Sequence, residues 1–216
     1  METFVVRKTN RPTPAAVQVS QVLDEMGVEW HEIGCVNWKD FPYRPGVAVR
    51  MGHNGEALML HYQVEEQTVA AVAESDNGRV WEDSCCEFFS QPANDQYYYN
   101  LECNCAGTVL LAAGKEREGR ERAPEEVLAL IDRWSSLGRE PFAEKTAPRQ
   151  WELCLTVPVR CFFKHGLHSL AGQTIRANFY KCGDRLQQPH FLSLFPISLP
   201  KPDFHRPDFF GLLTFE

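Results

Sequence analysis

The sequence lacks the short motifs that mark the commonest catalytic sites. Gly-x-Ser-x-Gly, a Walker phosphate loop, Gly-x-Gly-x-x-Gly and His-Glu-x-x-His are all absent from its 216 residues. Serine hydrolases of the α/β type, P-loop enzymes, dinucleotide-dependent enzymes and zincin proteases are therefore not indicated.

Long apolar runs and an excess of basic charge are also missing. No stretch approaches the ~18 consecutive apolar residues that a membrane span needs, and residues 1–10 contain no apolar secretory segment. The net charge is −7, and the basic residues of 115–122 alternate with glutamates. We expect neither nucleic-acid nor membrane partners. The expected location is the cytoplasm if Met1 is the native start, and otherwise the periplasm or the exterior.

Eight cysteines are present, but no Cys-x-x-Cys pair occurs, and Cys103 and Cys105 are too close in sequence for a zinc knuckle. Most of the others also lie among apolar residues, where a free thiol behaves as a small hydrophobe. We expect buried free thiols, with disulfides and a metal site as alternatives, at Cys85, Cys86, Cys103, Cys105, Cys154 and Cys161.

The chain is organised around residues 81–114, which read as three consecutive strands at 85–89, 97–105 and 108–113. Residues 91–95 and 106–107 carry the turn chemistry between them. In the second strand one face is expected to carry Tyr97, Tyr99, Leu101, Cys103 and Cys105, and the other Tyr98, Asn100, Glu102 and Asn104.

The remaining segments extend this β pattern. We expect a single domain over residues 1–216, in which residues 1–27 form an extended arm and a short helix at 15–26. A hairpin is predicted at 47–51 and 57–64, and further strands at 69–73, 150–157, 174–181 and 209–215. A second helix is predicted at 124–137. The pattern indicates an all-β protein, an antiparallel β-sandwich with one or two short peripheral helices.

Aromatic and polar residues on these strands suit a polar ligand such as a sugar, whose C–H face lies on an aromatic ring while its hydroxyls need fixed polar partners. The residues with this chemistry are Trp81, Glu87, Tyr98, Asn100, Asn104 and Asn178. Trp81 fits a core position equally well. A hydrolase would need a carboxylate pair, which Asp83, Glu87 and Glu102 could provide; hydrogen-bond acceptor roles are the alternative.

One segment suggests metal ligands. Residues 203–208 contain His205 between Asp203 and Asp208. The alternative is a tail loop pinned by an Asp–Arg pair. His190 is expected to be a hydrogen-bonded packing residue rather than a ligand.

Four stretches resemble the family 9 carbohydrate-binding modules, in particular the stand-alone family 9-like branch of gut-type bacteria. They are W-E-D-S-C-C-E-F-F, Y-Y-Y-N-L-E-C-N-C-A-G-T, R-A-N-F-Y-K-C-G-D and P-D-F-H-R-P-D-F-F-G. The resemblance spans residues 28–216 and implies a sandwich of jelly-roll type related to DOMON-like domains. In such modules two tryptophans enclose the terminal sugars of a glucan or xylan chain, structural calcium is bound, and a secreted glycoside hydrolase is usually attached.

The resemblance implies that Trp81 is the first sugar platform and Glu87 an acceptor for sugar hydroxyls. Asn100, Asn104 and Asn178 follow as polar contacts. Leu194 stands where the second tryptophan is expected, so Phe195 or Trp38 would have to replace it. The implied function is non-catalytic binding of mono- or oligosaccharides in polysaccharide catabolism. The alternatives are a structural module that has lost sugar binding and a glycan hydrolase that uses Glu87.

Overall fold

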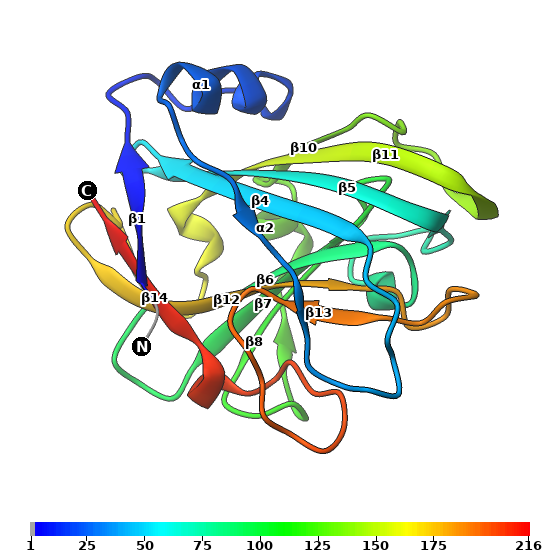
Figure 1. The fold of residues 1–216 in the computed structure, drawn as a ribbon. Coiled ribbons are helices and arrows are strands. Elements are labelled where there is room, and N and C mark those ends of the chain that lie inside the picture. The colour runs from blue at the N-terminus through cyan, green and yellow to red at the C-terminus, as the bar shows by residue number, and fades with distance from the viewer. Residues whose placement is uncertain (1–2) are drawn as a thin grey trace.

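A computed structural model describes residues 3–216, which form two packed β-sheets with little helix. In Figure 1 the longest strands make the upper layer, helix α1 lies over that layer, and the strands of the second sheet run below it. The predicted β-sandwich is therefore confirmed. Residues 1 and 2 of the predicted N-terminal arm lie outside the described residues.

Sheet B, the upper layer, has the strand order β10-β11-β5-β4, with β2 on β4. Its strands are β2 (His31–Glu32), β4 (Gly46–His53), β5 (Ala57–Ala71), β10 (Asp132–Ser135) and β11 (Phe142–Pro158). All of these pairings are antiparallel. The predicted hairpin at 47–64 is present, and β5 continues through most of the separate strand predicted at 69–73.

Sheet A, the lower layer, has the order β14-β12-β6-β7-β8-β9, with β13 on β12 and β3 on β13. Its strands are β3 (Cys35–Val36), β6 (Cys85–Gln91), β7 (Tyr98–Asn104), β8 (Val109–Gly114), β9 (Glu121–Arg122), β12 (Thr174–Cys182), β13 (Phe191–Ser193) and β14 (Gly211–Phe215). The strands predicted at 85–89, 97–105 and 108–113 are confirmed, and they form the middle of this sheet.

Strand β1 (Thr3–Lys8) joins the two sheets at one side of the sandwich. Its first residues run parallel to β14, and Arg7 and Lys8 continue parallel to β4. These two pairings make the antiparallel sandwich mixed at this edge, which Figure 1 shows at the left, where β1 and β14 run side by side.

The helical elements are short and peripheral. They are η1 (Ala16–Gln18), α1 (Val19–Glu25), η2 (Val80–Glu82), α2 (Glu125–Leu128), η3 (Val159–Cys161) and η4 (Pro207–Phe209). Helix α1 buries Val19, Val22 and Leu23 against the outer face of sheet B. Within residues 3–216, no helix combines the length and the apolar character that crossing a membrane requires.

The helix predicted at 124–137 is wrong beyond its first turn. α2 ends at Leu128, and residues 132–135 instead form β10. Trp134 pairs with Cys154 of β11, so the segment extends the edge of sheet B. Backbone pairing to a neighbouring strand outweighs the helical spacing of the apolar side chains.

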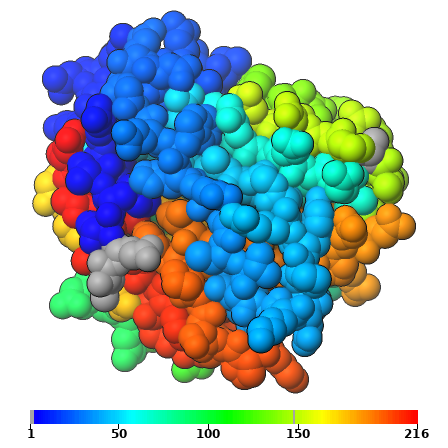
Figure 2. Space-filling model, in the orientation of Figure 1, coloured from blue at the N-terminus to red at the C-terminus, as the bar shows by residue number. Residues whose placement is uncertain are grey.

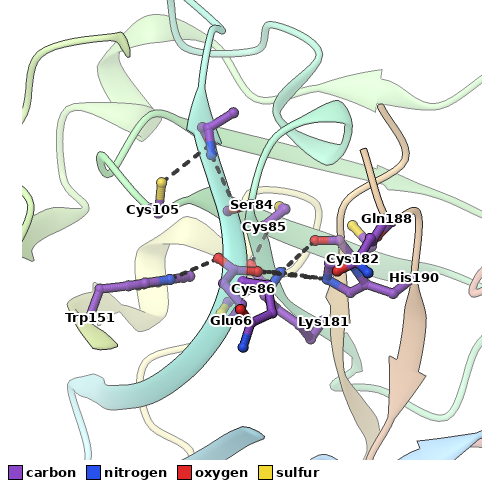
Figure 3. A network of polar contacts seen from close by, with 12 residues as sticks. Glu66, Ser84, Cys85, Cys86, Cys105, Trp151, Lys181, Cys182, Gln188 and His190 are labelled. Atoms are coloured by element: carbon purple, nitrogen blue, oxygen red, sulfur yellow. Dashed lines mark hydrogen bonds and ion pairs between the residues drawn. The ribbon is translucent and has the colours of Figure 1, made fainter. Parts of the chain in front are cut away.

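The core lies between the sheets, where alternate residues of both layers meet. One buried ion pair crosses it: the Glu66 carboxylate of β5 lies 2.9 Å from Lys181 Nζ of β12, and both side chains are fully buried. Figure 3 shows the surrounding network, in which Trp151 Nε1 also donates to Glu66 (2.8 Å) and Lys181 reaches His190 (2.8 Å). The six cysteines predicted as buried thiols are all buried and free.

Candidate functional site

A cavity of about 500 Å³ lies on the outer face of sheet A. Its floor comes from β6, β7 and β8, and its walls come from residues 115–122, the end of β12, and the loop that precedes η4. Figure 2 shows that loop, in orange, packed along the lower side of the molecule against the blue segment near residue 40. Trp38 Nε1 donates to the Leu199 carbonyl there, at 2.9 Å.

Trp81 stands at the rim of the cavity, half-buried, on the single turn η2. Its backbone carbonyl accepts the amide of Asp184 (3.2 Å) and lies 3.5 Å from the sulfur of Cys182. Beside it, Asp83 accepts the amides of Val72 and Ala73, which anchors η2 to the end of β5. These contacts fix the backbone of η2, which carries the indole at the cavity.

Glu87 and Glu102 form the acidic floor. They are direct cross-strand partners on β6 and β7, both side chains are at most 4% exposed, and both line the cavity. Burial raises the pKa of Glu87 well above its ordinary value, and the neighbouring Glu102 raises it further. Burial also raises the pKa of Glu102 to about 7. Two carboxyl groups this close and this dry cannot both ionise easily.

The hydrogen bonds of the two carboxyl groups differ. Glu87 Oε1 accepts the Cys182 thiol at 2.9 Å. Glu102 Oε1 accepts the Asn100 amide at 2.8 Å, whereas Glu102 Oε2 is buried and has no partner among the described residues. A buried carboxylate oxygen without a donor is costly in a folded protein. The unpaired Glu102 Oε2 is therefore the strongest indication that the cavity binds a ligand that donates hydrogen bonds.

Asn100 connects Glu102 to Arg120, which belongs to the wall formed by residues 115–122. Its Oδ1 accepts from Arg120 Nε (2.8 Å), and Arg120 also lies over the Tyr98 ring, 4.0 Å from its centroid. The Tyr98 hydroxyl pairs with His205 Nδ1 at 3.0 Å. Burial, together with the nearby charges of Arg120 and Arg117, lowers the pKa of His205 to about 3, so the imidazole is neutral near pH 7.

The structure thus brings three of the seven candidate residues into the cavity: Trp81, Glu87 and Asn100. Tyr98 is fully buried beneath it and holds Arg120 and His205, which do line it. Glu102 was predicted only as a possible catalytic acid or hydrogen-bond acceptor and not as a ligand-binding residue. Its position on the same strand face as Asn100 could have indicated that it lines the site.

Asn104, Asn178 and Phe195 lie elsewhere. The Asn104 side chain donates to Asp83 and accepts from two backbone amides of the following turn. Asn178 exchanges two hydrogen bonds of 3.0 Å with the backbone of Phe195. Phe195 is buried in the main core against Gly211, where a Cβ atom would overlap its ring. All three stabilise the fold beside the site, and we leave them out of the ligand-binding set.

Neither Phe195 nor Trp38 forms the second aromatic wall. Trp38 is 4% exposed and packs against Phe191 and Phe204. Those two phenylalanines line the cavity instead, together with Phe89. Phe191 belongs to β13 and lies three residues before Leu194. No pattern in the sequence indicated that this strand would present Phe191 to the cavity.

A second cavity, of about 560 Å³, lies on the outer face of sheet B and is lined by Trp134 and several Glu and Gln side chains. Its polar groups largely pair with protein. Glu152 contacts His61 (2.8 Å), Gln150 donates to Glu65 (3.2 Å), and Glu32 pairs with Arg44 (2.6 Å). Because its carboxylates already have partners, this cavity is the weaker candidate for a polar ligand.

The segment 203–208 does not present a metal site. Asp208 pairs with Arg206 at 2.6 Å and His205 is bonded to Tyr98, so the alternative of a loop pinned by an Asp–Arg pair is confirmed. Over residues 3–216, one group of three His, Cys, Asp or Glu side chains is close enough to hold an ion: Cys85, Glu87 and Cys182. Two sulfur ligands do not fit structural calcium, which prefers six to eight oxygens.

Comparisons with known proteins agree on one family. The model of carbohydrate-binding family 9 matches residues 17–215. A solved structure of a candidate carbohydrate-binding protein from Bacteroides uniformis is 50% identical, covers 100% of this chain and 99% of its own, and superposes with a TM-score of 0.98. No curated protein sequence matches the chain.

Two solved family 9 modules from Caldicellulosiruptor kristjanssonii share the fold at 11% identity. One, in complex with cellotriose, has a TM-score of 0.62 and covers 100% of this chain and 94% of its own. The other, in complex with glucose, has a TM-score of 0.57 and covers 100% and 96%. From the family match and the 50% identical structure we conclude that this chain belongs to carbohydrate-binding family 9.

Proposed function

We propose that the cavity on sheet A binds short glucan- or xylan-type saccharides, and that the protein holds these sugars without cleaving them as part of polysaccharide catabolism. One observation carries the proposal. Glu102 Oε2 is a buried acceptor that lacks a donor among the described residues, and it lies in the same cavity as Trp81 and Glu87. A sugar hydroxyl supplies the missing donor.

The shape and lining of the cavity support a sugar. Trp81 and Phe191 offer apolar faces for the C–H groups of a pyranose ring. A volume of about 500 Å³ lies within the usual range for small-molecule sites. The related Caldicellulosiruptor modules were solved with cellotriose and glucose, which supports a ligand built from glucose. We expect dissociation constants of roughly micromolar to millimolar, because an open site buries little ligand surface.

The experiment is a fluorescence titration with glucose, xylose, cellobiose and xylobiose. Trp81→Ala should lose the response. Trp30→Ala is the matched control, because Trp30 is also partly exposed but packs on Arg50 and His61 of sheet B. If the unmodified protein gives no response to any of the four sugars at tens of millimolar, the alternative of a structural module without a sugar site is the better account.

The second candidate function is glycan hydrolysis. The observation that favours it is the pair of neighbouring acids, Glu87 and Glu102. Family 9 is a family of non-catalytic binding modules, so we expect no release of reducing sugar from xylan or cello-oligosaccharides. Release that disappears in Glu87→Gln would establish the hydrolase instead.

A further inference from the structure

The buried side chains of Cys85, Glu87 and Cys182 lie close together beside the cavity. Cys85 and Glu87 are two residues apart on β6, so both point to the outer face of sheet A. Cys182 of β12 is the direct register partner of Cys85. The two Sγ atoms and a carboxylate oxygen of Glu87 all lie within 4.8 Å of one another.

We propose that Cys85, Cys182 and Glu87 bind one zinc ion. Two thiolates and a carboxylate form a donor set that suits zinc, and the soft sulfur ligands disfavour calcium and magnesium. Ligand atoms on one tetrahedral zinc lie roughly 3.3–3.8 Å apart, given metal–ligand distances of about 2.0–2.3 Å. Side-chain adjustments of about one ångström therefore place all three ligands on the same ion.

The fourth coordination position faces the cavity. Cys182 and Glu87 both line the cavity, while Cys85 lies behind them. Three protein ligands with one position open to a water or a small molecule are typical of exchangeable zinc sites. The second oxygen of Glu87 stays free for a sugar hydroxyl, so the metal site and the proposed sugar site can coexist, and neither proposal depends on the other.

Acidic side chains lie beside the three ligands, and Arg117, Arg120 and Arg122 line the same cavity. Glu102 and Asp184 line the same cavity, and both lie near Glu87. The nearest buried ammonium group is that of Lys181, whose charge is compensated by Glu66 at 2.9 Å on the inner side of the sheet (Figure 3). The guanidinium of Arg120 is held by Asn100 and the Tyr98 carbonyl.

The test is metal binding by protein purified under reducing conditions and stripped with a chelator. We expect one equivalent of Zn²⁺ by calorimetry, and Co²⁺ should give the near-ultraviolet absorption of thiolate-to-cobalt charge transfer. Cys85→Ser and Cys182→Ser should each weaken zinc binding by about 100-fold and reduce the cobalt absorption, because each variant retains one thiolate. Circular dichroism of each variant shows whether it has folded.

Cys86→Ser is the matched control, because Cys86 is adjacent in sequence and equally buried but belongs to the core between the sheets. It should bind zinc like the unmodified protein. The proposal is overturned if the stripped protein binds neither ion, or if both site variants bind zinc normally. It is also overturned if protein purified without reductant carries a Cys85–Cys182 disulfide in peptide mapping and binds no metal after reduction.

Discussion

Glu87 and Glu102 face each other across β6 and β7 as direct register partners, buried in the floor of one cavity. Buried pairs of acids are rare in positions that only stabilise a fold, because each charge raises the cost of the other. In this protein the pair marks where a ligand with hydroxyl groups is expected, and it has a measurable consequence for stability.

The stability of the metal-free protein should fall as the pH rises through the Glu102 titration. The folded-state pKa of Glu102 is about 7, above its ordinary value of 4.5, so its contribution is complete below about pH 4.5 and is lost as the pH approaches 7. In Glu102→Gln this loss is absent. The free energy of unfolding of the variant, relative to the unmodified protein, should rise by on the order of 3 kcal/mol between pH 4.5 and 7.5.

Urea unfolding at several pH values provides this measurement. The difference between the two proteins is needed because His205 has the opposite dependence: its lowered pKa destabilises the fold as the pH falls below about 6.5. Parallel pH profiles for the two proteins would contradict the assignment of a raised pKa to Glu102.

Removing only one partner of the ion pair between Lys181 and Glu66 should lower the free energy of unfolding more than removing both partners. Lys181→Met leaves the Glu66 carboxylate buried with Trp151 Nε1 as its main donor, and we expect a loss of about 3–5 kcal/mol. The double variant Glu66→Gln/Lys181→Met should recover part of that loss, since glutamine can still accept from Trp151. Additive losses in a double-mutant cycle would argue against direct coupling.

Asn100 and Asn178 should behave differently although both are buried asparagines on sheet A. Asn178→Ala removes the two hydrogen bonds to the Phe195 backbone and should cost about 2 kcal/mol of stability with little change in sugar affinity. Asn100→Ala frees Glu102 and Arg120 in the cavity and should weaken sugar binding about tenfold. Equal effects of the two substitutions on affinity would show that the cavity is not the binding site.

Much of the fold could be predicted because the alternation of apolar and polar residues within single strands indicates which face of each strand is buried. The alternation along residues 97–105 correctly separates Leu101 and Cys103, which belong to the core, from Asn100 and Glu102, which face the cavity. The failure at 130–137 has a tertiary cause. The helical spacing there is real, but β11 offers an edge on which the segment pairs as β10.

The cavity floor could also be predicted, whereas its far wall could not. Glu87 and Asn100 belong to neighbouring strands in sequence order, so strand alternation brings them together, and Trp81 lies on the turn η2 that precedes β6. Phe191, Phe204 and His205 come from the long C-terminal segment, whose path over sheet A depends on contacts such as Tyr180 stacked on Phe204 with centroids 4.1 Å apart. No local pattern encodes that contact. The same holds for the Asn178 side chain, whose hydrogen-bond partner Phe195 lies outside β12.

The central claim is that the cavity between Trp81 and Glu102 holds a sugar, and a crystal structure of the protein grown with cellobiose tests it most directly. The account predicts a pyranose ring against the Trp81 indole, with a hydroxyl donating to Glu102 Oε2. Cellobiose bound at another surface, such as the Trp134 cavity of sheet B, with the Glu102 site unchanged, would contradict it.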